Sequence, residues 1–327
     1  MRRGRLVLFW ALSAASLAAL IICPWLGAWN ISPFDLLGEE NALEAKIFWQ
    51  LRVPRALMAW CAGATFGVCG MVFQAIFRNP LAEPSLLGIS SGAALGAAVA
   101  IRFGRAGASS QIPLSISAFL GAMVSILIIS AFAKLVRSAK DATLLLAGVA
   151  ISALFSSMIM VFQYTGGASE TYKLLSWTMG GINVVGAGEG LRAIPSLLIV
   201  AALAMYYSTE LDLIALGDEI ASSRGVELER TKWVLFVGMS VSIAIVVSNC
   251  GPVAFLGLIA PHAARGATGP RHLGLTVLTA LIGGAALLAC DTAARTIWAP
   301  ADLPVGIIVS FLGVPFFLWL LFASRIR

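Results

Sequence analysis

Long apolar runs, separated by short polar segments, constrain this chain more than any other feature of its sequence. Ten runs can be distinguished, and most have the length of about 20 residues that crosses a bilayer as a helix. Charged residues make up only 12% of the 327 residues, against about 25% in soluble domains. Lipid accepts helices or closed barrels, and a barrel would show alternating segments of roughly ten residues. The sequence therefore predicts an all-α, polytopic membrane protein.

The runs predict about ten transmembrane helices within a single domain over residues 1–327. Eight long runs lie near residues 6–26, 56–77, 113–133, 143–163, 189–207, 231–248, 273–293 and 305–323. Two shorter, polar-interrupted runs lie near 85–101 and 253–264. The first run ends at Pro24-Trp25 without a small-residue cleavage site, which favours a retained helix over a signal peptide.

The basic residues favour one orientation of these helices. With the N-terminus inside, fourteen of the 22 lysines and arginines fall on the inner side and eight on the outer side. The positive-inside rule then predicts that both termini are cytoplasmic. Arg52, Arg55 and Arg295 are among the outer residues. Their guanidinium groups are compatible with interfacial snorkelling or with a surface that recognises acidic groups.

The stretch Arg78–Gly96 contains two prolines followed by a run of glycine, serine and alanine. Pro80 and Pro84 disfavour a continuous helix, and small residues allow membrane helices to approach closely. With Arg78 on the inner side, this stretch predicts a turn at the cytoplasmic face that leads into a closely packed helix. We interpret it as scaffold.

The longest inner loop, residues 208–230, has an apolar face, two punctuating glycines and charges of both signs. Leu213, Leu216 and Ile220 recur at spacings of three and four, as on one face of a helix. A simple linker would be polar or Gly/Ser-rich throughout, so the pattern favours short helices that dock a partner. On the outer side, residues 166–181 predict a short helix whose only cation is Lys173.

Catalytic motifs are absent from the sequence. It has two histidines, His262 and His272, and it lacks a P-loop, a G-x-S-x-G and an H-E-x-x-H motif. A lone histidine makes a poor metal site, so we expect no metal, no cofactor and no enzymatic activity in this chain. Ser152 and Ser156 lie one helical turn apart in the run near residues 143–163. They either line a water-filled path or bond back to the helix backbone.

Several motifs, in order and at family spacing, resemble the FecCD-type permeases, the membrane subunits of ABC importers for iron–siderophores, haem and cobalamin. The motifs are Arg52-Val-Pro-Arg55, Arg78-Asn-Pro-Leu-Ala-Glu-Pro-Ser-Leu-Leu-Gly-Ile-Ser-Ser-Gly-Ala-Ala94, Leu144-Leu-Leu-Ala-Gly-Val149, Ser176-Trp-Thr-Met-Gly-Gly181, Leu216-Gly-Asp-Glu-Ile-Ala-Ser-Ser-Arg-Gly225, Gly251-Pro-Val-Ala-Phe-Leu-Gly-Leu-Ile-Ala-Pro-His262 and Leu303-Pro-Val-Gly-Ile-Ile308. They cover the chain nearly end to end.

The resemblance implies a type II ABC importer permease in the bacterial inner membrane. Such a subunit pairs with a second copy of itself, with two cytoplasmic ATPase subunits and with a periplasmic substrate-binding protein, and the solute path follows the dimer axis. The site residues that it implies fall into three groups. Arg52, Arg55 and Arg295 would dock the binding protein. Leu216, Gly217, Asp218, Glu219, Ala221, Arg224 and Gly225 would couple to the ATPase. Ala142 and Thr143 would lie at the cytoplasmic gate, with Ser152, Ser156 and Gln163 along the path.

We therefore expect import of a large metal chelate by alternating access, with an iron–siderophore or haem ahead of cobalamin. Choice of the solute would rest largely with the binding protein. The alternative class is an ion-coupled secondary transporter, which needs carboxylates or histidines embedded in the membrane. Asp291 is the clearest candidate, and the scarcity of others disfavours this alternative. A purely structural subunit is disfavoured by the inner docking loop.

Overall fold

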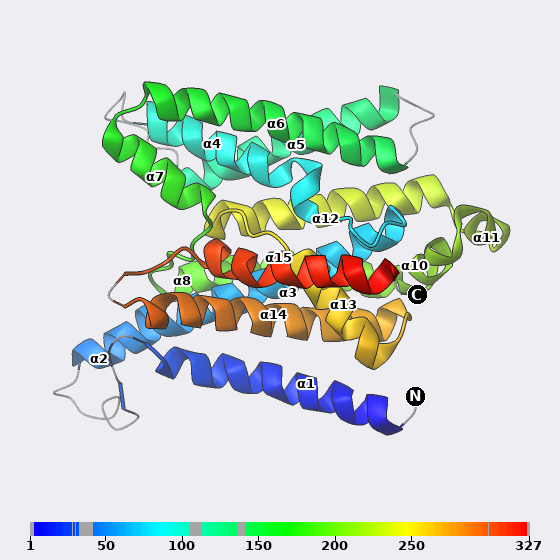
Figure 1. Ribbon diagram of the computed structural model, residues 1–327, viewed down its shortest axis with the longest axis horizontal. Coiled ribbons are helices and arrows are strands. Elements are labelled where there is room, and N and C mark those ends of the chain that lie inside the picture. The colour runs from blue at the N-terminus through cyan, green and yellow to red at the C-terminus, as the bar shows by residue number, and fades with distance from the viewer. Residues whose placement is uncertain are drawn as a thin grey trace.

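The computed structural model describes residues 3–27, 29, 31–32, 42–104, 113–135, 141–299 and 301–325. Most of its helices run roughly along the long axis of the molecule (Figure 1). All ten predicted runs form helices. They are α1 (Arg3–Ile22), α3 (Val53–Ile76), α4 (Ile89–Phe103), α5 (Leu114–Leu135), α6 (Asp141–Thr165), α9 (Ile194–Tyr206), α12 (Leu228–Cys250), α13 (Leu256–Thr268), α14 (His272–Ile297) and α15 (Val305–Arg325).

Shorter helices connect these elements. They are η1 (Cys23–Trp25), α2 (Ala42–Ile47), the π-helical turn η4 (Phe48–Arg52), η5 (Pro84–Leu87), α7 (Ala168–Thr178), α8 (Ala187–Gly190), η6 (Leu191–Ala193), α10 (Ser208–Leu216) and α11 (Asp218–Ser223). α2 and η4 continue directly into α3, so the second span begins before the predicted residue 56. Among the described residues, seven helical segments are long and apolar enough to cross a membrane by themselves.

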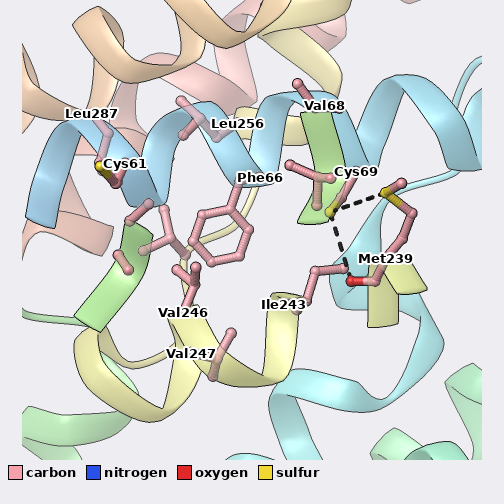
Figure 2. Close-up of a cluster of buried hydrophobic side chains, with 14 of the residues drawn as sticks. Cys61, Phe66, Val68, Cys69, Met239, Ile243, Val246, Val247, Leu256 and Leu287 are labelled. Carbon is pink, nitrogen blue, oxygen red and sulfur yellow. Dashed lines mark hydrogen bonds between the residues drawn. The ribbon is translucent and has the colours of Figure 1, made fainter. Parts of the chain in front are cut away.

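The helix α3 is the centre of the bundle. Its continuous helical segment, Leu43–Ile76, is 89% buried over its most apolar stretch, and α3 packs against α9, α12, α13 and α14. Figure 2 shows Phe66 and Cys69 of α3 facing α12, where the Cys69 thiol lies 3.7 Å from both the sulfur and the carbonyl oxygen of Met239. Because lipid tails are as apolar as these side chains, the bundle is held by close packing rather than by exclusion from water. A rigid α3 therefore sets the positions of Arg55 near its first turn and of Arg78 just beyond its last.

The helices α4, α5 and α6 form a second layer, drawn at the top of Figure 1. Small residues bring α4 and α5 together. A Cβ atom added to Gly92 would lie 2.6 Å from the carbonyl oxygen of Gly121, closer than real Cβ contacts. The predicted close packing of the third span is confirmed, since any larger side chain at Gly92 would force the two helices apart.

Both termini lie at the same end of the molecule, together with α10 and α11, whereas α2, α7 and α8 lie at the opposite end (Figure 1). This placement agrees with an even number of crossings. Following the predicted orientation, we call the end with the termini the inner end and the opposite end the outer end.

The chain after α3 differs from the prediction of a turn that stays at the inner face. The backbone N–H of Asn79 donates to the carbonyl of Gln74, at 3.1 Å, and that of Arg78 donates to Ala75, at 3.2 Å. These bonds form a Schellman cap in which Arg78 takes the left-handed position, with φ of 45°. Glycine is usual there, because a side chain costs about 1 kcal/mol in this conformation.

Residues 79–88, which we call the re-entrant segment, then turn back into the bundle. Ala82, Glu83 and Leu87 are buried. The segment fits because glycines face it on both sides. A Cβ atom on Gly257 of α13 would lie 2.9 Å from Pro84 Cδ, and one on Gly148 of α6 would lie 2.9 Å from Leu87 Cα. The turn predicted at the cytoplasmic face thus continues as an internal connector between α3, α6 and α13.

Candidate coupling loop and outer arginine cluster

The inner loop, residues 208–230, contains α10 and α11, as its pattern predicts, and we call it the coupling loop after its predicted role. Gly217 joins them with φ of 134°, a conformation that residues other than glycine rarely adopt. The predicted apolar face does not lie on one continuous helix, because this break ends the helical register after Leu216. Leu216 and Ile220 are exposed, at 67% and 46%. The residues that anchor the loop to the bundle are instead buried ones, namely Leu211, Ile214 and Ala221.

The seven predicted coupling residues therefore separate into two groups. Six are exposed or half-buried, namely Leu216, Gly217, Asp218, Glu219, Arg224 and Gly225. Ala221 is fully buried and faces the bundle. Two carboxylates tie the loop to neighbouring helices, with Asp212 contacting His272 and Asp218 contacting Arg78 and Lys232. The loop thus offers apolar side chains outward from a fixed base, as a docking element requires.

Arg52 is buried at the outer end of the bundle. Only 7% of the residue is exposed. Its guanidinium donates to the backbone carbonyls of Pro24, Trp25 and Trp29. Arg52 therefore holds the segment that follows α1 against η4.

Arg55 bridges two carboxylates at the outer end. Its Nε and Nη2 donate to the fully buried Asp291 of α14, at 2.9–3.1 Å. Its Nη1 and Nη2 donate to Asp302, at 2.8 and 3.1 Å, in the segment before α15. The Asp302 side chain is 49% exposed. Arg55 is thus fully engaged within the chain, and one of its two partners is open to solvent.

Arg295 completes what we call the outer arginine cluster, Arg52, Arg55 and Arg295. Its Nη2 donates to the carbonyl of Cys23, at 2.9 Å, and its Nε lies 3.6 Å from Asp291. Each guanidinium of the cluster binds an internal acceptor, which gives three of the eight basic residues predicted on the outer side a structural role. Docking of a binding protein by these arginines stays a prediction.

The predicted path residues lie along α6. Only 17% of the apolar span of this helix is buried within the chain. Thr143 is half-buried near the inner end, Ser156 is exposed, and the side chain of Ala142 lies outside the described set. Ser152 donates its hydroxyl to the Gly148 carbonyl, at 2.9 Å, so the back-bonding alternative holds for this serine. The backbone carbonyl of Gln163 accepts from Thr171 of α7, at 3.0 Å.

A cavity of about 660 Å³ lies beside α15. Its wall includes Ser90, Met179, Pro252, Phe311 and Val314, which come from α4, the end of α7, the loop before α13, and α15. The sequence analysis missed this cavity, because its residues come from four separated parts of the chain and none has a distinctive spacing.

No group of three or more His, Cys, Asp or Glu side chains that could hold a metal occurs among the described residues. His262 is exposed and packs against the ring of Phe316, with centroids 5.6 Å apart. Asp291, the best coupling carboxylate for an ion-driven transporter, is flanked by Arg55 and Arg295. A carboxylate held by two guanidinium groups is a structural ion pair rather than an open cation site.

The bundle of apolar helices is that of a polytopic membrane protein. The chain belongs to the FecCD transport family, whose model matches residues 14–323.

Relatives of this chain are permeases of several import systems. It is 37% identical to the cobalamin import system permease protein BtuC of Halobacterium salinarum, over 85% of this chain and 73% of that protein. It is 32% identical to the iron(3+)-hydroxamate import system permease protein FhuG of Bacillus subtilis, over 92% of each chain. It is 34% identical to the hemin transport system permease protein HmuU of Yersinia pestis, over 98% of this chain and 94% of that one.

A solved structure supports the same assignment. A metal-chelate type ABC transporter in an inward-facing conformation aligns with a TM-score of 0.85 and 27% identity, over 97% of this chain and 99% of that one. The predicted family, the all-α fold of about ten transmembrane helices and the role of ABC importer permease are thereby confirmed. The protein is a multi-pass membrane subunit, and ATP hydrolysis resides in separate subunits of such importers.

Proposed function

We propose that this permease imports an iron–siderophore or haem across the bacterial inner membrane, with both termini in the cytoplasm. The permeases for iron(3+)-hydroxamate and hemin support this cargo class. Cobalamin is the alternative within the same family, supported by the BtuC proteins. All three are large, preformed chelates, so a wide path between helices suits them better than a tight binding pocket.

The working assembly contains a second copy of this chain, two ATPase subunits at the inner end and a binding protein at the outer end. Residues 1–327 act as one permease domain. The coupling loop carries this proposal, because it exposes Leu216 and Ile220 at the inner end while its base is buried. Exposed apolar side chains on a firmly anchored helix pair are typical of a docking surface.

The outer arginine cluster meets the binding protein. Arg55 supplies the contact, because its partner Asp302 is half-exposed and can exchange for a carboxylate of the incoming protein. Arg52 and Arg295 hold the segment after α1 in place beside Arg55 through their hydrogen bonds to its backbone carbonyls. A guanidinium favours this exchange, because its planar fork binds carboxylates in pairs.

Transport follows from differential stability of inward-facing and outward-facing states, which the partner proteins bias. Closure of the ATPases on ATP pushes on Leu216, Gly217, Asp218, Glu219, Arg224 and Gly225, and Ala221 transmits the force to the bundle. α6 then moves, with Ala142 and Thr143 at the cytoplasmic gate and Ser152, Ser156 and Gln163 along the path. The helix can move because little of its surface is packed against the rest of the chain.

Docking of the ATPase is tested with a double substitution, Leu216→Ser and Ile220→Ser, in the permease purified with its ATPase. We expect the ATPase to dissociate while the permease remains folded, because these two side chains are largely exposed, at 67% and 46%. Leu191→Ser is the matched control, an exposed leucine, at 49%, in η6 at the outer end. Full co-purification and full transport in the double variant would overturn the coupling assignment.

The cargo is tested through the binding protein that docks on this permease. Ferric hydroxamate siderophores, haem and cobalamin are titrated onto it, and the ligand bound with the lowest Kd is then followed into proteoliposomes that contain the whole complex. Uptake of a siderophore or haem supports the proposal. Uptake of cobalamin alone would replace it with the alternative.

A further inference from the structure

The side chain of Asp218 connects the coupling loop to the end of α3 and to the start of α12. Asp218 begins α11, in the coupling loop. Its Oδ2 lies 3.3 Å from Nη2 of Arg78 and 3.1 Å from Nζ of Lys232, near the start of α12. The contact with Arg78 joins the loop to the end of α3. It is therefore an ionic link between the coupling loop and the start of the re-entrant segment.

Arg78 is an unexpected residue at its position. It occupies the left-handed residue of the Schellman cap of α3, at φ of 45°, where glycine has no steric penalty. A residue held in a disfavoured conformation points to a use for its side chain. Here the side chain reaches Asp218. Glycine would suit the backbone better at this position. The contact of the guanidinium group with Asp218 therefore gives a reason for an arginine there.

The chain that follows Arg78 leads directly into the membrane-embedded bundle. Glu83 accepts hydrogen bonds from the backbone N–H of Phe255 and from the Ser85 hydroxyl. The Gly88 carbonyl accepts from Ser125 of α5, at 2.8 Å. Ser85 also lines the cavity beside α15. The ten residues that follow Arg78 thus contact α5, the start of α13 and the cavity wall.

We propose that Arg78 is a positioning residue of transport, which passes the motion of the coupling loop, received through Asp218, into the re-entrant segment. This inference rests on the proposed coupling role of the loop. Such a residue touches neither ATP nor the solute. Its loss would leave ATPase docking intact, since Arg78 lies at the end of α3 and outside the coupling loop. It would lower the response of ATP hydrolysis to the loaded binding protein.

Arg78→Gly separates this role from a role in folding. Glycine suits the cap, so the thermal unfolding midpoint is expected to stay equal or rise. The complete complex in nanodiscs should still contain its ATPase, whereas stimulation of ATP hydrolysis by the loaded binding protein, and transport, should fall by about fivefold or more, the usual size of coupling between sites. Arg78→Lys should recover part of the loss, because an ammonium keeps the charge without the planar fork. Arg230→Gln is the matched control, since Arg230 pairs with Glu227 on an exposed surface at 3.4 Å.

A double-mutant cycle with Asp218→Asn identifies the link itself. If Arg78 acts through Asp218, the double variant should lose no more activity than the more severe single variant. Losses that multiply, or an Arg78→Gly complex with unaltered stimulation, would overturn the inference. Failure of the proposed function is distinguishable, because the unsubstituted complex would then show neither stimulated ATP hydrolysis nor chelate uptake.

Discussion

The carboxylate of Asp212, in α10 of the coupling loop, caps the first turn of α14 from outside that helix. Its Oδ1 accepts the backbone N–H of His272, at 2.8 Å, and lies 2.6 Å from Nδ1 of the same residue. The two residues are 60 positions apart. One side chain thus satisfies a free N–H at the start of α14 and fixes the loop to the bundle.

Asp212→Ala should lower the free energy of unfolding by about 1 kcal/mol, the usual loss when a capping oxygen is removed. Asp212→Asn retains an acceptor oxygen and should recover most of this stability. Thermal unfolding of the permease in detergent measures both variants. Equal midpoints for the alanine variant and the parent protein would contradict the capping role.

Arg55→Gln should destabilise the outer end strongly, because it leaves the buried Asp291 with Arg295 as its remaining ionic partner. Breaking a buried pair costs on the order of 3 kcal/mol or more, and removing both charges restores much of it. The double variant Arg55→Gln with Asp291→Asn should therefore be more stable than the single one. Denaturant titration gives the comparison.

The control for that experiment is Arg102→Gln. Arg102 pairs with Glu170 at 3.1 Å, and its side chain is 36% exposed. An exposed pair contributes less than about 1 kcal/mol. A loss in Arg102→Gln as large as that in Arg55→Gln would show that burial of Asp291 is not the cause.

Asp302→Asn should increase the affinity of the permease for an acidic binding protein. Asp302 occupies the outward donors of Arg55, at 2.8 and 3.1 Å, so removal of its charge frees them. The gain should be about twofold to fivefold at low salt, the value of one exposed ion pair, and should shrink as salt screens the charges. Titration of the binding protein onto permease in nanodiscs measures the change.

Glu189→Gln serves as the comparison, because Glu189 pairs with Arg192, also near the outer end, at 3.1 Å. That variant should bind like the parent protein. A weaker complex with Asp302→Asn would mean that Asp302 itself supports docking, and that the exchange of carboxylates on Arg55 does not occur.

The raised pKa of Glu83 predicts that the stability of the permease depends on pH. Glu83 lies in the re-entrant segment outside the long helices, and burial raises its pKa from 4.5 to about 7, against the opposing effect of its hydrogen bonds. The folded state therefore holds the proton more tightly than the unfolded chain does. The stabilisation is complete below pH 4.5 and is lost as the pH rises to about 7, by roughly 3 kcal/mol in total.

Glu83→Gln should remove this slope, because glutamine keeps an acceptor for Phe255 and does not titrate. Unfolding midpoints of both proteins are measured at several pH values across this window. The difference between them should favour the parent protein more at the acidic end than at neutral pH. Parallel curves would show that Glu83 keeps an ordinary pKa in the folded protein. Glu229→Gln, an exposed substitution at the start of α12, should follow the parent curve.

The positions of the helices were predictable, whereas the roles of individual polar residues were only partly so. The apolar runs located all ten spans, and the pattern of residues 208–230 located the coupling loop. The same pattern did not reveal that Gly217 divides the loop into two helices, or that Leu211, Ile214 and Ala221 anchor it to the bundle. Likewise, the prolines after Arg78 indicated a turn, but the glycines that admit this turn into the bundle lie on α6 and α13.

The sequence by itself determined the membrane class, the helices and the family, because a lipid environment leaves an apolar run few alternatives to a helix. Tertiary structure alone decided how the charges are used. Arg55 and Asp291 are 236 residues apart, and Arg78 meets Asp218 only because α3 ends beside the coupling loop. Local pattern encodes backbone conformation, whereas the partner of a buried charge depends on which distant segment packs against it.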